Sequence, residues 1–330
     1  MCIRDSRMLA GGGTDLEPRQ RAMADAIAWS YELLPPELAT LFRRLGILQG
    51  GARLEEIEAI CRPESDLGID TLEGLAALID QSLVQVHRFG ESRYTMLNVL
   101  REFALGQLAD DEFRELQARH ARAYLALAER AQAELSGRDR RRWLDRLERD
   151  IDNLRVAVDY LIDHELADEA MRFAYAMWRL WQTRGMLYEG RAVVERVLLL
   201  DGGSSLSRMR AYEALGGLAY WQDDHEGVTE AYQSALDLAR ELGDPLEEAK
   251  ALHNASYAPN LRGDTARATA LLEEAGGLYR MYGDDVGLSD VLTALAVTRE
   301  EDGDYRAALE AARQGIAIAR KVGNDSRLSW

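Results

Sequence analysis

The chain has 330 residues, of which 57 are Asp or Glu and 40 are Lys or Arg, so its formal net charge is −17. This charge argues against a nucleic-acid-binding surface spread over the whole chain. No apolar run approaches the roughly 18 residues that a membrane-spanning helix needs, and two cysteines cannot form a disulfide framework. The cytoplasm is therefore the expected location.

The first segment, residues 1–19, fits no pattern in the rest of the chain. We expect a disordered or artefactual start followed by a linker. The glycine run Gly11–Gly13 is not followed by a lysine, which favours a linker over a phosphate-binding loop.

Residues 20–110 are predicted to form a winged helix-turn-helix domain. The pattern gives helices followed by a β-hairpin and a closing helix, over Ala22–Leu34, Glu37–Leu45, Leu54–Cys61, Thr71–Ser82, Leu83–Val86, Arg93–Met96 and Leu97–Leu108. The candidate recognition helix, Thr71–Ser82, contains Glu73 and Asp80 and no Arg or Lys. An acidic helix has the wrong sign for phosphate contacts, so no direct nucleic-acid partner is expected. Residues 111–164 are predicted to be connecting helices, Asp110–Leu135 and Arg140–His164.

Residues 165–330 are predicted to form an α-helical hairpin solenoid of the tetratricopeptide type. Its glycine-plus-polar anchors recur every 40 residues, at Gly243-Asp244, Gly283-Asp284 and Gly323-Asn324. Two amphipathic stripes per period require stacked helix pairs, because neither helix can bury its apolar face alone. Trp181-Gln182 also recurs as Trp221-Gln222, and Pro259 should kink or end a helix. The last copy is incomplete at Trp330, so we expect a fragment truncated at its C-terminus.

No catalytic or metal-binding set emerges from the sequence. The histidines are isolated, and the acidic turns such as Asp223-Asp224 are expected to be solvated rather than metal-binding. Most of five aromatic residues are expected in the core, with any exposed ones serving as anchors for a peptide or small ligand; the five are Trp178, Trp181, Tyr188, Tyr220 and Trp221. The candidate effector groove consists of Trp178, Arg179, Trp181, Gln182, Trp221, Gln222, Asn254 and Arg299.

Several blocks, in order, resemble the bacterial STAND signal-transduction regulators. The matching blocks are Arg19-Gln20-Arg21, Ala26–Leu34, Leu41–Leu45, Leu83-Val84, Tyr94–Leu97, Leu100–Ala104, Trp143–Glu148 and Asp152–Arg155. In that family a winged helix follows an NB-ARC-type ATPase module, and tetratricopeptide-like repeats follow the winged helix. The resemblance thus implies a mainly α chain of this order.

This chain departs from the family in its nucleotide contacts. It contains no G-x-x-x-x-G-K-[ST] loop, so it holds no cofactor itself, and the resemblance places ATP or ADP in an upstream module. Plant-type relatives have Met-His-Asp where this chain has Met96-Leu97-Asn98. Leucine cannot replace the phosphate contact, and we expect Leu97 to pack in the core. By the same resemblance, the candidate residues for a relay to the ATPase are Arg19, Trp29, Met96, Leu97 and Asn98.

The leading hypothesis is the regulatory or sensor portion of a STAND-family ATPase or transcriptional regulator. Its repeats would bind a protein or small-molecule effector, and its winged helix would relay that event to the ATPase module in the same protein, which oligomerises on activation. The alternative is a free-standing tetratricopeptide-like scaffold for protein interactions. An enzyme ranks third, because the sequence offers no catalytic set.

Overall fold

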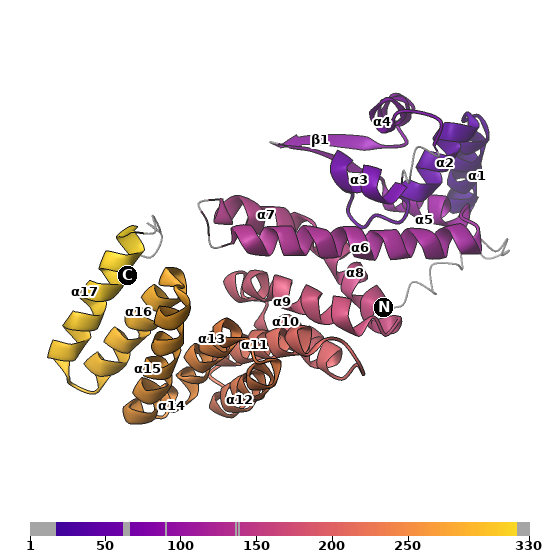
Figure 1. The fold of residues 1–330 in the computed structure, drawn as a ribbon. Helices are drawn as coiled ribbons and strands as arrows, with labels where there is room; N and C mark the ends of the chain where they lie inside the picture. The colour runs from indigo at the N-terminus through magenta and orange to yellow at the C-terminus, as the bar shows by residue number, and fades with distance from the viewer. Residues whose placement is uncertain (1–17, 62–66, 90, 136, 138, 322–330) are drawn as a thin grey trace. The chain divides into compact units, whose positions relative to one another are not determined.

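The computed structural model describes residues 18–61, 67–89, 91–135, 137 and 139–321. The chain is mainly α-helical, as predicted, and divides into two compact units. The first contains residues 1–127 and 146–160, and the second contains residues 128–145 and 161–330 (Figure 1). No helix within the described ranges is long and apolar enough to cross a membrane.

The first unit follows the order of elements predicted for a winged helix. Its elements are α1 (Pro18–Glu32), α2 (Pro36–Leu45), α3 (Leu54–Cys61), α4 (Thr71–Asp80), β1 (Gln85–Phe89), β2 (Glu91–Thr95) and α5 (Asn98–Gly106). The strands are antiparallel, with Val86 opposite Tyr94. The first strand begins at Gln85 rather than Leu83, because the N–H groups of Leu83 and Val84 donate to the Leu78 carbonyl. The winged-helix assignment itself stays a prediction.

The connecting helices are α6 (Asp110–Glu134), α7 (Arg140–Arg149) and α8 (Ile151–Asp163). The prediction of one continuous helix over Arg140–His164 was wrong, because the helix is interrupted at Asp150. The Asp150 carboxylate is fully buried and accepts a hydrogen bond from Arg93 of β2 at 2.7 Å. Arg93 also donates to the carbonyls of Gly50, Gly51 and Arg149, so this break in the helix supports the β-hairpin.

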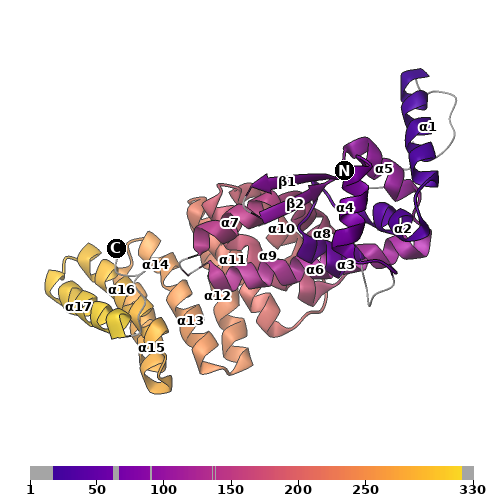
Figure 2. The same ribbon diagram turned by 90° about the horizontal axis from the view of Figure 1, so that it is seen from above.

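The second unit consists of successive helix pairs, side by side in Figures 1 and 2. The first helices of the pairs are α9 (Ala167–Thr183), α11 (Ser205–Trp221), α13 (Pro245–Ala255) with α14 (Tyr257–Leu261), and α16 (Asp285–Glu301). The second helices are α10 (Leu187–Leu198), α12 (His225–Leu242), α15 (Thr265–Tyr282) and α17 (Tyr305–Lys321). This is the tetratricopeptide-like solenoid that the repeat predicted. The anchor at Gly323 and the polar residue after it lie outside the described residues.

Each turn inside a pair uses one backbone motif. One residue adopts the left-handed conformation, at Gly185, Asp223, Gly263 and Gly303. The next N–H then donates to the carbonyl five residues back, as in Asp264 to Pro259 at 2.9 Å. Pro259 has no N–H to offer, and its helix is broken at Ser256, as predicted.

The acidic residues of the turns have a structural role that the sequence reading missed. Asp224, Asp264 and Asp304 accept hydrogen bonds from backbone N–H groups at the start of the second helices, and Asp244 and Asp284 do the same for the first helices. These carboxylates are helix caps rather than merely solvated groups. Within the described residues, no group of acids, histidines and cysteines could hold a metal ion.

The turn motif also corrects the predicted pairing of Trp181 with Trp221. The shared hydrogen bond runs from Met186 to Trp181 in the first pair and from Asp224 to Ala219 in the second. Trp181 is therefore equivalent to Ala219, because the first repeat is two residues shorter than the later ones. Accordingly, Trp181 is 2% exposed, whereas Trp221 is 56% exposed.

Candidate functional site

Polar side chains of consecutive first helices interact with one another on one surface of the solenoid. We call this the first-helix face and define it by Tyr175, Arg210, Glu213, Glu247, Lys250 and Asn254. In the corrected register Arg172, Arg210 and Lys250 occupy one repeat position on α9, α11 and α13. Each of them pairs with an acid on a different helix, namely Glu129, Glu247 and Glu213.

Glu213 is the centre of the first-helix face. Its carboxylate accepts hydrogen bonds from Lys250 Nζ at 2.7 Å and from the Asn254 amide at 3.0 Å. Lys250 Nζ also contacts the Tyr175 hydroxyl at 2.8 Å, and Arg210 donates to Glu247 at 2.7 Å. Hydrogen bonds thus link three successive first helices, α9, α11 and α13.

The electrostatics of this cluster follow from burial. Glu213 is 4% exposed, and burial raises its pKa although the Lys250 charge opposes that shift. Burial also opposes the charged form of Lys250, but the interactions with Glu213 and Tyr175 together outweigh it, so the Lys250 pKa is raised. Removing Lys250 would leave the buried Glu213 carboxylate uncompensated, which is costly.

Aromatic groups lie at the next turns of the same helices. The Arg179 guanidinium stacks over the Trp178 indole, 3.8 Å from its centroid. A Cβ atom at residue 217 would lie 2.7 Å from that indole, so only the glycine at this position admits it. Tyr220 packs edge-on against Trp221 and Tyr257, with centroids 6.0 and 5.4 Å apart.

The structure brings together only part of the predicted groove. Trp178, Arg179 and Asn254 lie on α9 and α13, and Trp221 lies exposed at the end of α11. The other members are placed differently. Trp181 is core, packed on Gly190 of α10, and Gln222 accepts a hydrogen bond from Arg191 of the same helix. Gln182 lies in the last turn of α9, and Arg299 on α16 lines a separate hollow.

The expectation that most of these aromatic residues are core was wrong. Only Trp181 among the five is fully buried, while Tyr188, Tyr220 and Trp221 are exposed and Trp178 is half-buried. The reason is their position: Tyr220 and Trp221 fall at a helix end, and Tyr188 begins a second helix.

Sequence reasoning missed Glu213, Lys250 and Tyr175. One signal was available, because Lys250 and Lys321 are the only lysines in a chain whose other cations are arginines. A single acid inside the otherwise apolar stripe of 211–221 was a second signal, since a buried carboxylate needs a partner.

The candidate relay residues lie in the first unit. Trp29 on α1 is 66% exposed and Leu97 is 52% exposed, so the expectation that Leu97 is core was wrong. Leu97 immediately precedes α5 with its backbone extended, which turns its side chain away from the core. Asn98 is exposed and Met96 is half-buried, whereas the Arg19 side chain lies outside the described residues.

Among known sequences, the chain matches a group of mycobacterial proteins. Over 328 residues, or 96% of its length, it is 30% identical to proteins of Mycobacterium tuberculosis and Mycobacterium bovis named as candidate HTH-type transcriptional regulators. The chain spans 37% of the length of these relatives. No family model matches the chain.

Two solved structures share the helical-repeat fold. RapI in its apo form covers 61% of this chain and 72% of its own, at 18% identity and a TM-score of 0.50. A Rap protein complexed with Competence and Sporulation Factor covers 92% of this chain and 79% of its own, at 17% identity and the same TM-score of 0.50. A STAND protein with a tetratricopeptide repeat sensor from Pyrococcus horikoshii reaches a TM-score of 0.45 at 14% identity, which is too low to establish a common fold.

Proposed function

We propose that the chain is the sensor portion of a STAND-type regulator, and that its first-helix face binds a protein or peptide effector. The observation that carries the proposal is the linkage of α9, α11 and α13 through Tyr175, Lys250, Glu213 and Asn254. Exposed aromatic and cationic groups on the same helices, Trp221 and Arg179, supply the kind of anchors that dominate interface affinity.

Two comparisons support this reading. The mycobacterial relatives are named as candidate regulators, and the chain corresponds to only 37% of their length, which leaves room for further modules in such proteins. The Rap structure with its bound factor supports the use of this fold for holding a partner.

The relay is the second part of the proposal. An effector that prefers one arrangement of the repeats would shift the first unit through the helices α6, α7 and α8, whose residues belong to both units. Trp29 and Leu97 are the exposed apolar side chains of the first unit that we assign to contact an NB-ARC-type ATPase module. ATP or ADP would bind in that module rather than in this chain.

Effector binding can be tested with a displayed random-peptide library selected against the purified chain. We expect enriched peptides to lose at least about tenfold in affinity with Trp221→Ser or Arg179→Ala, which remove the proposed anchor side chains at the next turns of the helices that form the first-helix face. Tyr188→Ser is the matched control, because Tyr188 is also an exposed aromatic residue but lies on the second helix α10. Equal losses in all variants would contradict the assignment of the face.

The relay needs a separate measurement. Nucleotide exchange of the whole protein that carries this chain should change when a selected peptide is added. If the peptide binds the first-helix face and exchange stays constant, the relay is wrong and the alternative, a tetratricopeptide-like interaction scaffold, replaces it.

A further inference from the structure

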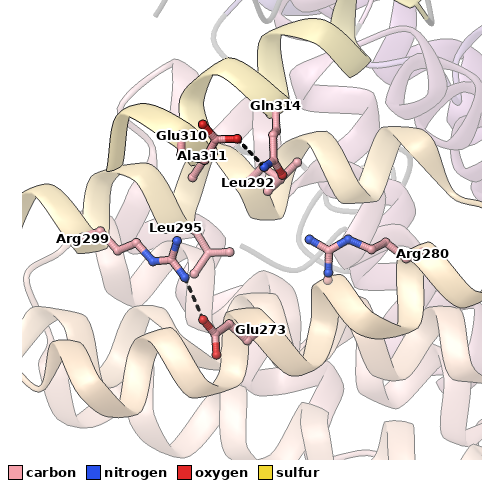
Figure 3. A pocket seen from close by; sticks show the side chains of 9 residues that line it. Glu273, Arg280, Leu292, Leu295, Arg299, Glu310, Ala311 and Gln314 are labelled. Atoms are coloured by element: carbon pink, nitrogen blue, oxygen red, sulfur yellow. Dashed lines mark hydrogen bonds and ion pairs between the residues drawn. The ribbon is translucent and has the colours of Figure 1, made fainter. Parts of the chain in front are cut away.

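A hollow of about 270 Å³ lies between the last two helix pairs of the solenoid. It is bordered by α15, α16 and α17, and Figure 3 shows the side chains that line it. Leu292 and Leu295 form its apolar floor, and charged groups approach it from all three helices. It shares none of its lining with the first-helix face, so a ligand here would be independent of the function proposed above.

The 40-residue repeat supplies an internal reference for this hollow, because every lining residue has an equivalent at the preceding junction. There, Leu236 is 3% exposed and belongs to the core, and Leu271 packs against the same core. The corresponding residues at the hollow are Gly276 and Ala311. Two leucine side chains of the repeat pattern are therefore replaced by a hydrogen atom and a methyl group, which opens the space.

The arginine that borders the hollow, Arg280, lacks the acidic partners that its equivalent in the preceding repeat has. At the preceding junction, Arg240 pairs with Glu248 at 3.2 Å and lies 3.8 Å from Glu274. Its equivalent is Arg280, and the acids are replaced by Leu288 and Gln314. Within the part of the chain that the structure describes, Arg280 has no hydrogen-bonding or ionic partner, and Figure 3 shows its guanidinium directed into the hollow.

Of the other charged side chains that line the hollow, Arg299 and Glu273 pair with each other, and Glu310 is left without a cation among the residues that the structure describes. Arg299 stands where the preceding repeat has Pro259, and it is neutralised by Glu273 at 2.7 Å. Glu310 stands where that repeat has Ala270, and among the described residues it accepts a hydrogen bond only from Gln314, at 2.8 Å. An unpaired guanidinium and an unpaired carboxylate thus flank an apolar floor.

We propose that this hollow binds a small apolar zwitterion, namely an α-amino acid or a dipeptide. Its carboxylate pairs with Arg280, its ammonium group pairs with Glu310, and its side chain lies on Leu292 and Leu295. Guanidinium–carboxylate pairing supplies direction, and the apolar floor supplies contact area. The volume suits a ligand smaller than a typical drug molecule, for which pockets begin at about 300 Å³.

Calorimetric titration of the complete 330-residue chain with L-leucine and with L-leucyl-L-leucine tests the proposal. At least one of them should bind, and the tighter of the two identifies the ligand as a free amino acid or a dipeptide. The N-acetylated form of the tighter ligand lacks the ammonium group and its C-terminal amide lacks the carboxylate, so each should bind at least about tenfold more weakly than that ligand, a loss of about 1.4 kcal/mol per missing ion pair.

Variants locate the site. Arg280→Gln should weaken binding at least about tenfold, whereas Arg240→Gln, at the equivalent position of the preceding junction, should leave it unchanged. Gly276→Leu restores the residue of the preceding repeat and should abolish binding by filling the hollow. A Cβ atom there would lie 3.4 Å from Val291, an ordinary contact, so this variant is expected to fold.

Three results would overturn the proposal. They are no detectable binding of either zwitterion up to about 10 mM, equal binding of the tighter zwitterion and its C-terminal amide, or wild-type affinity in Arg280→Gln. The last comparison holds even if Gly276→Leu misfolds, because Arg280 is exposed and its substitution leaves the helix packing intact.

Discussion

His120 is a buried base that makes the stability of the first unit dependent on pH. Its Nε2 donates to the Asn153 side-chain oxygen at 3.1 Å, and the Asn153 amide donates to the carbonyls of Gln49 and Gly51. Burial lowers the His120 pKa to about 4, although the Asn153 hydrogen bond opposes that shift. The unfolded chain binds the proton near pH 6.5, so acid favours unfolding.

The expected effect sets in as the pH falls below 6.5 and reaches about 2 kcal/mol of lost stability at pH 5. Urea unfolding of wild type and His120→Gln at pH 7.5 and pH 5 measures it, with the difference between the two pH values as the readout. The variant should lose about 2 kcal/mol less than wild type does. His87→Gln, at an exposed histidine of β1, should behave like wild type. If His120→Gln lost as much stability as wild type between pH 7.5 and pH 5, the burial argument would be wrong.

At the scale of one helix, two glycines near α15 should respond to alanine in opposite directions. A Cβ atom would meet nothing within 4 Å at Gly263 or at Gly277, so packing does not distinguish them. Gly263 lies in the turn before α15 with φ +75°, a left-handed conformation that costs an L-residue about 1–2 kcal/mol. Gly277 is exposed inside the helix, where alanine is favoured by about 1 kcal/mol.

Thermal unfolding of the two variants checks this sign change. Gly263→Ala should lower the midpoint, and Gly277→Ala should raise it, by a few degrees each. A midpoint that does not fall in Gly263→Ala would mean that the turn does not require the left-handed conformation, and a lower midpoint in Gly277→Ala would contradict the helix-propensity argument.

The sequence could predict these elements because the repeat period, the caps and the turns are local signals. It could not reveal that the first repeat is two residues shorter. Trp181 and Trp221 are 40 residues apart like the later anchors, although the equivalent turn residues, Trp181 and Ala219, are only 38 apart. The break at Asp150 depends on Arg93, which is distant in sequence, and the contact of Lys250 with Glu213 joins two repeats. Clusters assembled by such contacts depend on the fold, so the sequence could not tell which members of the predicted groove lie on neighbouring first helices.

At the scale of the whole molecule, the negative net charge argues against direct DNA binding by this chain. The net charge is −17, and Glu73 and Asp80 lie exposed on α4, which carries no Arg or Lys. Non-specific DNA binding comes almost entirely from cations that neutralise phosphates, so an acidic chain with an acidic α4 is repelled. The mycobacterial relatives named as candidate HTH-type regulators are far longer than the matched region, so their name does not locate a DNA contact within it.

We therefore expect the chain to leave a fluorescent 30-base-pair duplex free at physiological salt, with an apparent Kd weaker than about 10⁻⁴ M. Fluorescence anisotropy at low and physiological salt is the measurement, because phosphate contacts would strengthen steeply as salt is removed. A binding curve with that salt dependence would contradict the charge argument and make α4 a recognition helix. The double variant Glu73→Lys, Asp80→Lys then tests α4 directly, because it should gain affinity for the duplex only if α4 can enter a DNA groove. If neither wild type nor the double variant binds the duplex, any DNA binding of a longer protein that carries this chain belongs to residues outside these 330.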